Sequence, residues 1–389
     1  MNHMAKLLAK LALFCLLLGV PFIFPAVLMV RSGEYRSLVS VIKEQRDYSR
    51  TTLYMNLFSD FENVYKRMAV ADRQPDILTV GGSRMHQFRS KFFKPGVNFY
   101  NGAFAASGFE DYINLLHAFD PNHRPKILIV SLDYLNFDPV RRADMKSFAP
   151  FDDRTALGNV IRGDWRELYY YPLIHKITWS SIWDMLKGGR RADGNTAYIG
   201  LRANIEKGGV RNDGSYRWAL RIDTSEDWMV SRQHIDDVVA RIGPGKGAWE
   251  FADTISEEGI IALKEFLSQA AQDHIYVIGI LPPFSHRIHA AIETLHDDRE
   301  KSMEELPARL RQVFAGYDSV VYDFSDPTAF GSSDAEMLDE HHASEKAALR
   351  MSIDMAEQDP VLAAYVDVPY LKSQLNSTTS NTEVFYNQL

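Results

Sequence analysis

The chain has a single cysteine, Cys15, among its 389 residues. One cysteine can form neither an intramolecular disulfide nor a cysteine-based zinc cluster. The chain also lacks a basic excess, because 43 lysine and arginine residues stand against 51 aspartate and glutamate residues. Nucleic-acid binding relies on positive charge to neutralise phosphates, so no nucleic-acid partner is expected at a net charge of −8. With 46% hydrophobic residues, the chain can build one large domain or two ordinary ones.

The longest uncharged run covers residues 11–30, LALFCLLLGVPFIFPAVLMV. A helix of that length spans about 30 Å, which is enough to cross a bilayer once. The short N-terminal tail carries Lys6 and Lys10, and it favours a cytoplasmic N-terminus. Residues 1–34 are therefore predicted to be a single-pass anchor in the inner (cytoplasmic) membrane, with the rest of the chain facing the periplasm or the cell exterior. A cleaved signal peptide and a buried core helix are the alternatives.

The remaining sequence divides by pattern. Apolar positions over 35–75 occur at mixed helical spacing and predict a juxtamembrane helical segment. Strand and helix patterns alternate over 76–360, interrupted by an aromatic-rich insertion at about 140–250. Residues 361–389 are predicted to form a polar C-terminal tail, and the part from 371 to 389, rich in Ser, Thr, Asn and Gln, is predicted to be disordered.

Five short apolar runs within 76–360 predict buried strands. They cover residues 76–80, 97–101, 126–132, 274–281 and 319–323. Continuous apolar strands separated by helices are typical of a mainly parallel sheet with helices on both faces. The predicted fold is therefore α/β, a three-layer α/β/α sandwich around a five-stranded sheet. Ligands of such sheets bind at the carboxyl ends of the strands, which is where a site is expected.

A serine, a histidine and an aspartate follow these strands in an order that suggests nucleophilic catalysis. Ser83 lies on the turn after the first strand, where its hydroxyl becomes a nucleophile only if an imidazole takes its proton. His341 or His342 could do so. Asp339 precedes His342 by three residues, a spacing that lets a carboxylate hold the ring through its Nδ1–H group.

The order of these motifs resembles the SGNH/GDSL hydrolases. The matching segments are Gly82-Ser83-Arg84-Met85, residues 100–104 (YNGAF) and residues 339–345 (DEHHASE). They are most similar to membrane-anchored members that partner membrane-bound O-acyltransferases in modifying envelope polymers. The resemblance covers about 76–357 without the insertion. It implies that Ser83 is the nucleophile, His342 the general base and Asp339 its orienting partner.

The resemblance also implies an oxyanion hole. The backbone N–H groups of Ser83 and Gly102 match the first two donors of the family. The third, an asparagine side chain, is replaced here by Asp133, whose carboxylate would repel an oxyanion. Asn136 could substitute if the loop turns it inward. Loss of one such donor typically costs about a hundred- to a thousandfold in rate.

Arg84, Asn101 and Asp133 are the candidate substrate-binding residues. Each has a structural alternative: Arg84 in a salt bridge to a nearby carboxylate, and Asn101 in shaping a turn. Ser83 could likewise only cap a helix. A metal site is a weaker option, since the sequence lacks His-Glu-x-x-His. Its possible ligands would be His286, His289, His341, His342 and Asp133. No metal and no cofactor are expected.

These patterns lead to one main hypothesis and two rivals. The main one is a membrane-anchored serine enzyme that adds or removes a short acyl group, acetyl above all, on an envelope or secreted polysaccharide. Its partners would be that polysaccharide and a membrane-bound O-acyltransferase, as the resemblance implies. The first rival is a non-catalytic protein of the same fold that binds glycan or serves as a scaffold in an export complex. The second is a plain esterase or lipase.

Overall fold

The computed structural model divides the chain into two compact units. Unit 1 comprises Met1–Phe61 and Asp152–Arg211, and unit 2 comprises Glu62–Phe151 and Asn212–Leu389. The residues that the structure describes are 3–57, 62–144, 167–170, 178–188, 192–193, 196–219, 232–244 and 254–385. The predicted insertion at about 140–250 is thus divided: 152–211 groups with the N-terminal residues, and 212–250 belongs to unit 2.

Unit 2 is built on a five-stranded, all-parallel sheet, as the apolar runs predict. Its strands are β2 (Ile77–Val80), β3 (Phe99–Asn101), β4 (Ile127–Ser131), β9 (Tyr276–Leu281) and β10 (Ser319–Asp323). The spatial order is β10-β9-β4-β2-β3, and every neighbouring pair is parallel. The α/β class and the parallel five-stranded sheet are therefore confirmed.

The strand order creates a favoured place for a ligand. The first strand of the sheet, β2, lies between β3 and β4, so the chain winds in one direction to β3 and in the other to β4. Ligands of open α/β sheets bind outside the carboxyl ends at such a reversal. Ser83 follows β2 by three residues and therefore lies at this position.

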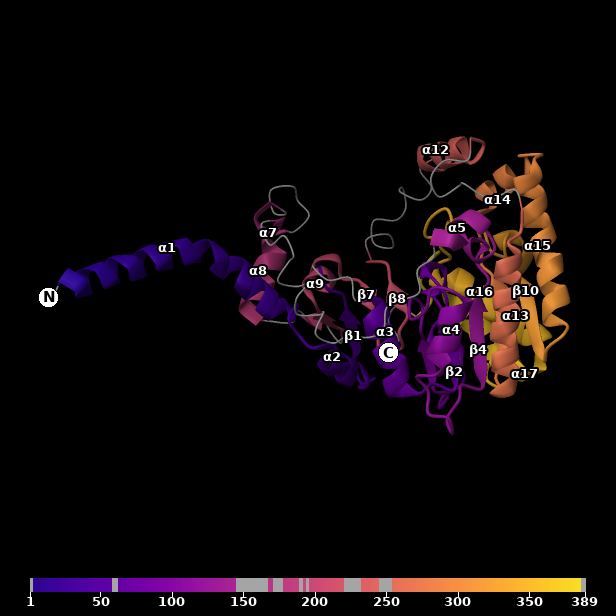
Figure 1. Cartoon of the computed structure of the whole chain (residues 1–389), viewed down its shortest axis with the longest axis horizontal. Helices are drawn as coiled ribbons and strands as arrows, with labels where there is room; N and C mark the ends of the chain where they lie inside the picture. The colour runs from indigo at the N-terminus through magenta and orange to yellow at the C-terminus, as the bar shows by residue number, and fades with distance from the viewer. Residues whose placement is uncertain are drawn as a thin grey trace. The chain divides into compact units, whose positions relative to one another are not determined.

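Alternation along the strands gives the sheet two apolar faces. Ile77, Ile129 and Ile278 belong to a core cluster that includes the buried face of helix α16 (Glu345–Gln358). The intervening strand residues point to the opposite face. Three further helices complete the unit around the sheet: α4 (Phe109–Leu116) packs on α13 (Glu257–Gln272), α13 contacts β9, and α15 (Asp298–Phe314) contacts β10. Figure 1 labels α4, α13, α15, α16 and β10.

The remaining elements of unit 2 are short. The helices are α3 (Glu62–Arg73), α5 (Pro139–Asp144), α12 (Arg232–Ile242), α14 (His286–Glu293), α17 (Pro360–Ala363) and α18 (Val368–Ser377), and one further strand is β8 (Tyr216–Arg217). The 3₁₀ turns are η1 (Ser83–Met85), η2 (Ser90–Phe92), η3 (Tyr134–Asn136), η5 (Pro327–Phe330) and η6 (Asp334–Glu336).

The prediction of a disordered tail at 371–389 is wrong for its described part, residues 371–385. Helix α18 packs on α16, and Leu371 and Phe385 are fully buried in the core cluster. The Glu345 carboxylate accepts hydrogen bonds from the backbone N–H groups of Val384 and Phe385. A few apolar side chains in a polar sequence are therefore enough to fix this segment, and composition averaged over the tail conceals them.

Unit 1 shows that 35–75 is not uniformly helical. It contains α2 (Leu38–Gln45) and then the strand β1 (Thr51–Tyr54), which pairs in parallel with β6 (Thr196–Ile199). The sequence Thr-Thr-Leu-Tyr is rich in β-branched and aromatic residues, which favours a strand. The other elements of the unit are α7 (Glu167–Tyr170), α8 (Trp179–Gly188), β5 (Ala192–Asp193), α9 (Leu201–Glu206) and β7 (Gly209–Val210).

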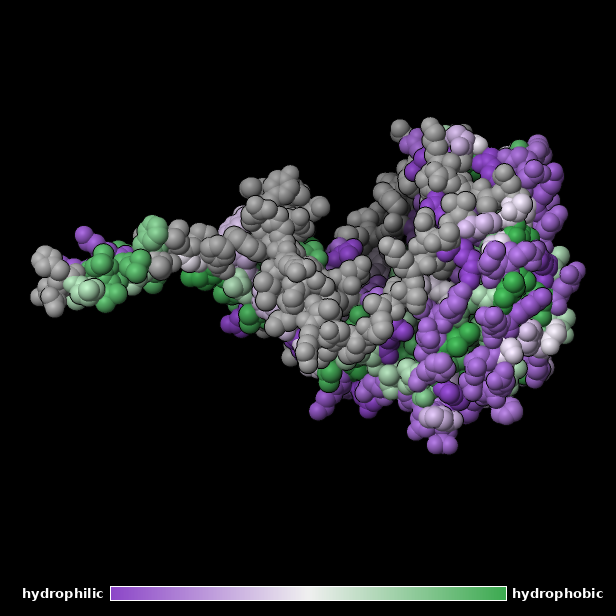
Figure 2. Space-filling view, viewed as in Figure 1, coloured by the Kyte–Doolittle hydropathy of each residue, from purple (hydrophilic) through white to green (hydrophobic). Residues whose placement is uncertain are grey.

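The N-terminal helix α1 runs from His3 to Ser32. Near its C-terminal end, Leu28 and Met29 are buried in a cluster with residues of α8 and α9. Toward its N-terminus, Leu7, Leu11 and Phe14 are exposed, and Figure 2 shows hydrophobic side chains gathered there. Within the described residues, no helix combines the length and the apolar character needed to cross a membrane. The transmembrane part of the prediction for residues 11–30 has no support from that search.

Candidate functional site

The turn after β2 presents Ser83. Gly81 precedes it with φ of +146°, and a Cβ there would lie 2.5 Å from the Cβ of Ser131. Glycine therefore lets the chain leave β2 directly against the end of β4. The 3₁₀ turn η1 begins at Ser83 and places its side chain partly in solvent, at the reversal point of the sheet.

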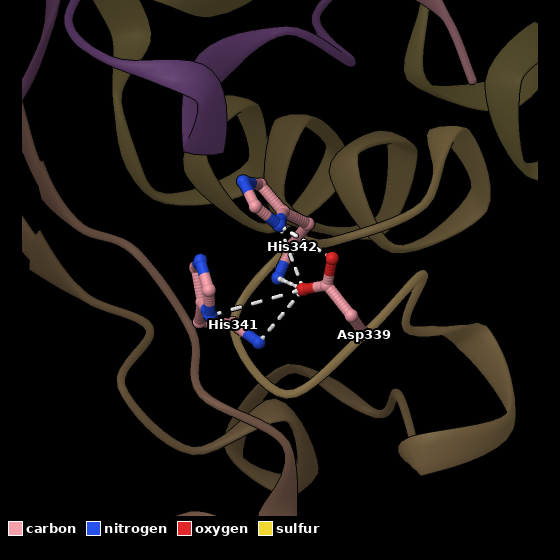
Figure 3. Close-up of side chains that lie close together, drawn as sticks. All are labelled: Asp339, His341 and His342. Carbon is pink, nitrogen blue, oxygen red and sulfur yellow. Dashed lines mark hydrogen bonds and ion pairs between the residues drawn. The ribbon is translucent and has the colours of Figure 1, made fainter. Parts of the chain in front are cut away.

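A closed loop presents the acid and the base. Met337 and Ala343 form an antiparallel bridge, and the Leu338 N–H donates to the His342 carbonyl oxygen at 2.7 Å. Inside the loop, Asp339 Oδ1 accepts hydrogen bonds from the backbone N–H groups of His341, at 3.1 Å, and His342, at 2.8 Å. Figure 3 shows the dashed lines that join the carboxylate to both of these residues. The spacing Asp-x-x-His thus corresponds to one turn, in which the backbone N–H groups of His341 and His342 donate to the side chain of Asp339.

The three predicted residues lie in one line of hydrogen bonds. His342 Nδ1 lies 2.7 Å from each oxygen of the Asp339 carboxylate, and His342 Nε2 lies 2.7 Å from Ser83 Oγ. Because an ionised carboxylate only accepts, Nδ1 carries the proton and Nε2 accepts from the serine hydroxyl. Asp339 is 1% exposed and His342 7% exposed, so water screens these bonds little. The geometry is that of a nucleophile, a base and an orienting carboxylate.

His341 does not take the base position. Its ring is about one-third exposed, and its Nδ1 lies 3.9 Å from Asp339 Oδ1 and 3.6 Å from a Glu340 oxygen. The sequence left open which of the two adjacent histidines is the base. In the structure His342 contacts Ser83, and the His341 ring lies beside the His342 ring, with centroids 4.2 Å apart.

The same loop offers one group of metal-ligating atoms. Among the described residues, Asp339, His341 and His342 provide ligand atoms within 4.8 Å of one another. Both ring nitrogens of His342 already bond in the hydrogen-bonded line, Nδ1 to Asp339 and Nε2 to Ser83, so a metal bound to either nitrogen would replace one of these contacts. The two uses therefore exclude each other. His286 and His289, the other predicted ligands, pair instead with Asp326 and Glu293.

The two N–H groups predicted to form the oxyanion hole differ in their hydrogen bonding. The Ser83 amide opens η1, so it has no acceptor within that turn and can point at a substrate. The Gly102 amide cannot, because it donates to the Thr79 carbonyl oxygen at 2.7 Å. This bond continues the pairing of β2 with β3 by one residue. Gly102 is therefore corrected from an oxyanion donor to a part of the sheet.

Asn101 is also a structural residue. Its side-chain amide donates to the carbonyl oxygens of Met85, at 2.8 Å, and Phe88, at 2.9 Å, and its Oδ1 accepts the Ala103 N–H. The side chain is fully buried and all three of these bonds are internal. The assignment of Asn101 to substrate binding is therefore wrong: it holds the turn that carries Ser83 against β3.

Arg84 is the buried tie between the strand ends, not a substrate ligand. Its guanidinium donates to the carbonyl oxygens of Pro282, at 2.7 Å, Pro283, at 2.8 Å, and His341, at 3.2 Å. It also pairs with Asp133 at 3.1 Å and lies over the Phe284 ring, 4.4 Å from its centroid. Only 7% of Arg84 is exposed. The structure thus shows the salt bridge that the sequence offered as the alternative role of Arg84, with Asp133 as its partner.

Asp133 is occupied by the same interaction. One of its oxygens accepts from Arg84, and the other caps η3 by accepting the Leu135 N–H at 3.2 Å. The guanidinium offsets the charge that would otherwise oppose an oxyanion. Asn136, the proposed substitute, ends η3 with its side chain buried, and its Oδ1 has no hydrogen-bond partner among the described residues.

Three aromatic side chains beside the triad were missed by the sequence reasoning. The Trp218 ring lies 4.9 Å from the His342 ring and 5.3 Å from Tyr216, and Tyr216 stacks on His86 at 4.9 Å. His86 Nε2 bonds to Glu62 at 3.0 Å, and burial lowers the pKa of His86 although Glu62 opposes this. Trp218 and Tyr216 fall in the stretch interpreted as an insertion, where no strand or helix pattern signals a role.

Lys66 holds the segment that carries Tyr216 and Trp218 through hydrogen bonds to backbone carbonyl oxygens. Its fully buried ammonium donates to the carbonyl oxygens of Asn101, at 3.1 Å, and Gly214. Gly214 has φ of +81°, and a Cβ there would lie 2.2 Å from the Asn101 carbonyl oxygen, so only glycine fits. Burial lowers the pKa of Lys66 to about 8, and Glu62 and Asp213 oppose that shift.

A pH-dependent stability follows from Lys66. The native lysine loses its proton near pH 8, but the unfolded one keeps it to about pH 10.4. The unfolded state therefore binds more protons between these values, and the free energy of unfolding rises with pH there. We expect chemical denaturation to show a rise of about 2 kcal/mol between about pH 7 and pH 10 that Lys66→Met lacks. Lys264→Met, which changes an exposed lysine, should show the same rise as the wild type. An equal dependence of the free energy of unfolding on pH in all three proteins would contradict the lowered pKa of Lys66.

Comparison with known proteins supplies no family. No protein-family model matches the chain, and no curated protein matches it. The argument for function therefore rests on the residues and their geometry.

Proposed function

We propose that the chain is a serine-dependent acyltransferase or esterase that adds or removes a short acyl group, acetyl above all, on an envelope or secreted polysaccharide. The observation that carries the proposal is the line from Ser83 Oγ through His342 to the Asp339 carboxylate, with each contact at 2.7 Å. The site lies where ligands of this sheet topology bind. The resemblance of the three motifs to SGNH/GDSL hydrolases supports the same class, and with it the three-layer arrangement of that fold.

The reaction proceeds in two halves. Ser83 Oγ attacks the acyl carbonyl carbon while its proton passes to His342 Nε2, and Asp339 stabilises the imidazolium that forms. The negative charge that develops on the carbonyl oxygen faces the Ser83 N–H. The alcohol leaves with the proton from Nε2, and the acyl group stays on Ser83. Water or a sugar hydroxyl then gives its proton to Nε2 and takes the acyl group, and Nε2 returns that proton to Ser83 Oγ as the bond between Ser83 and the acyl group breaks.

Intact mass tests the proposal. The full-length chain is incubated with p-nitrophenyl acetate, and we expect one acetyl increment in the wild type and none in Ser83→Ala. Ser268→Ala, which removes a hydroxyl on α13, is the matched control and should acquire the increment. An increment that persists in Ser83→Ala overturns the nucleophile assignment.

The rival is a non-catalytic glycan-binding or scaffold protein of the same fold. The Gly102 N–H favours it, because the hydrogen bond to Thr79 removes one expected oxyanion donor. Absence of both an acetyl increment and ester turnover in the wild type would support this rival and overturn the enzyme proposal.

Attachment to the inner membrane, with unit 2 in the periplasm or outside the cell, belongs to the same proposal. The uncharged run at 11–30 and the exposed leucines of α1 support it, and a membrane-bound O-acyltransferase is the proposed acyl donor system. A reporter fused after Leu389 should be active outside the cytoplasm. Activity confined to the cytoplasm overturns the proposed location.

A further inference from the structure

We propose that Trp218 is the wall of the substrate site against which a pyranose ring stacks, so that the site selects acyl esters of ring sugars over open-chain alcohols. The inference rests on the proposed function and deepens it. It starts from the position of Trp218: its ring contacts the ring of His342, the residue that contacts Ser83. A flat apolar side chain therefore borders the reacting atoms.

Trp218 is held in place by buried interactions of the segment before it. The Tyr216 N–H donates to the His86 carbonyl oxygen, and Gln87 donates to the Tyr216 carbonyl oxygen, each at 2.9 Å. Asp213 accepts hydrogen bonds from the N–H and hydroxyl groups of Ser90, at 2.9 and 3.0 Å. Asp213 and Tyr216 thus tie the segment to His86, Gln87 and Ser90, which follow Ser83 in the chain.

Lys66 supplies a further tie to the same segment. It is fully buried, and its ammonium donates to the carbonyl oxygen of Gly214. Burying an ammonium opposes folding unless its bonds compensate. Together with the His86–Tyr216 stack, this arrangement fixes Trp218 before any substrate arrives, which lowers the ordering cost of binding.

The chemistry around Trp218 favours a sugar. A pyranose has an apolar face of C–H groups and a rim of hydroxyls, so it needs an aromatic surface bordered by polar groups. Trp218 is half-buried, and the partly exposed His341 lies next to His342 on the same loop. An acyl ester of a ring sugar can therefore stack on Trp218 while its carbonyl carbon faces Ser83.

The test compares two esters in one enzyme. We measure kcat/KM for a mono-acetylated methyl glucopyranoside and for mono-acetylated glycerol with the full-length wild type, Trp218→Phe and Trp218→Leu. The wild type should prefer the pyranoside about tenfold or more, a typical value for one apolar contact in a site. Trp218→Leu should reduce that ratio toward one, and Trp218→Phe should retain most of it.

The ratio separates recognition from a packing role. If Trp218 only supports His342, both esters lose rate together and the ratio stays at its wild-type value, which overturns the inference. A wild-type ratio near one overturns it as well, with the proposed function intact because both esters are still cleaved. If the wild type cleaves neither ester and forms no acetyl adduct, the proposed function fails and the inference fails with it.

Discussion

Asp339→Asn is expected to lower kcat for ester turnover about ten-thousandfold while the protein stays folded. The asparagine oxygen can still accept the backbone N–H groups of His341 and His342 that close the loop. Its NH₂ group, however, faces His342 Nδ1 as a donor, which favours the tautomer with the proton on Nε2. That tautomer cannot accept the Ser83 proton, so the loss falls on the chemical step.

Steady-state kinetics with p-nitrophenyl acetate measure this effect. Glu340→Gln, one residue away in the same loop, is the matched control, because its carboxylate takes no part in the line from Ser83 to Asp339. We expect the Glu340→Gln rate to stay within a few-fold of the wild type. His342→Ala should cost about as much as the double variant with Asp339→Asn, since residues that act as one unit are not additive. If kcat of Asp339→Asn stays within tenfold of the wild-type value, Asp339 serves only to close its loop through the backbone N–H groups of His341 and His342.

The sheet and the triad could be read from the sequence because both are encoded locally. Each strand is a short run of β-branched and apolar residues, such as Ile127–Ser131, that stands out against its flanks. Asp339 and His342 lie three residues apart, so a single turn brings them together. The position of Ser83 follows from the rule that the carboxyl ends of parallel strands lie at one edge of the sheet, and its assignment also used the order of the motifs along the chain.

The errors arise where one residue belongs to two patterns. Gly102 follows a strand and matches a family motif, but its N–H group belongs to the ladder between β2 and β3, whose length the sequence does not reveal. Leu53 lies in β1, and Met55 and Leu57 continue its spacing of two beyond the end of that strand. The prediction of a helical segment over 35–75 includes these positions, although a spacing of two is typical of a strand.

The remaining omissions depend on distant contacts. Trp218 reaches His342, 124 positions later, through a segment with little regular structure, so no local period marks it. Phe385 fills the core beneath α16 from a stretch of polar composition. Such placements follow from tertiary packing, which overrides local propensity.

Arg84→Met is expected to lower the free energy of unfolding by about 3–5 kcal/mol, the cost of breaking a buried ionic tie by removing one partner. The methionine fills part of the space beside Phe284 but leaves the carbonyl oxygens of Pro282, Pro283 and His341 without this donor. Asp133 also loses its cation. The ends of β4 and β9 and the loop that carries the histidines should therefore separate more easily.

Chemical denaturation distinguishes this tie from a substrate contact. Arg287→Met removes an arginine paired with Asp236 on the surface, and it should cost less than about 1 kcal/mol. Asp133→Asn keeps an acceptor for Arg84, so its loss of unfolding free energy should lie between those of Arg84→Met and Arg287→Met. Arg84→Met with wild-type stability, but a raised KM for an anionic ester alone, would return Arg84 to the substrate-binding role. The expected pattern instead makes Arg84 a structural residue: it joins the turn that carries Ser83, the proposed nucleophile, to the ends of β4 and β9.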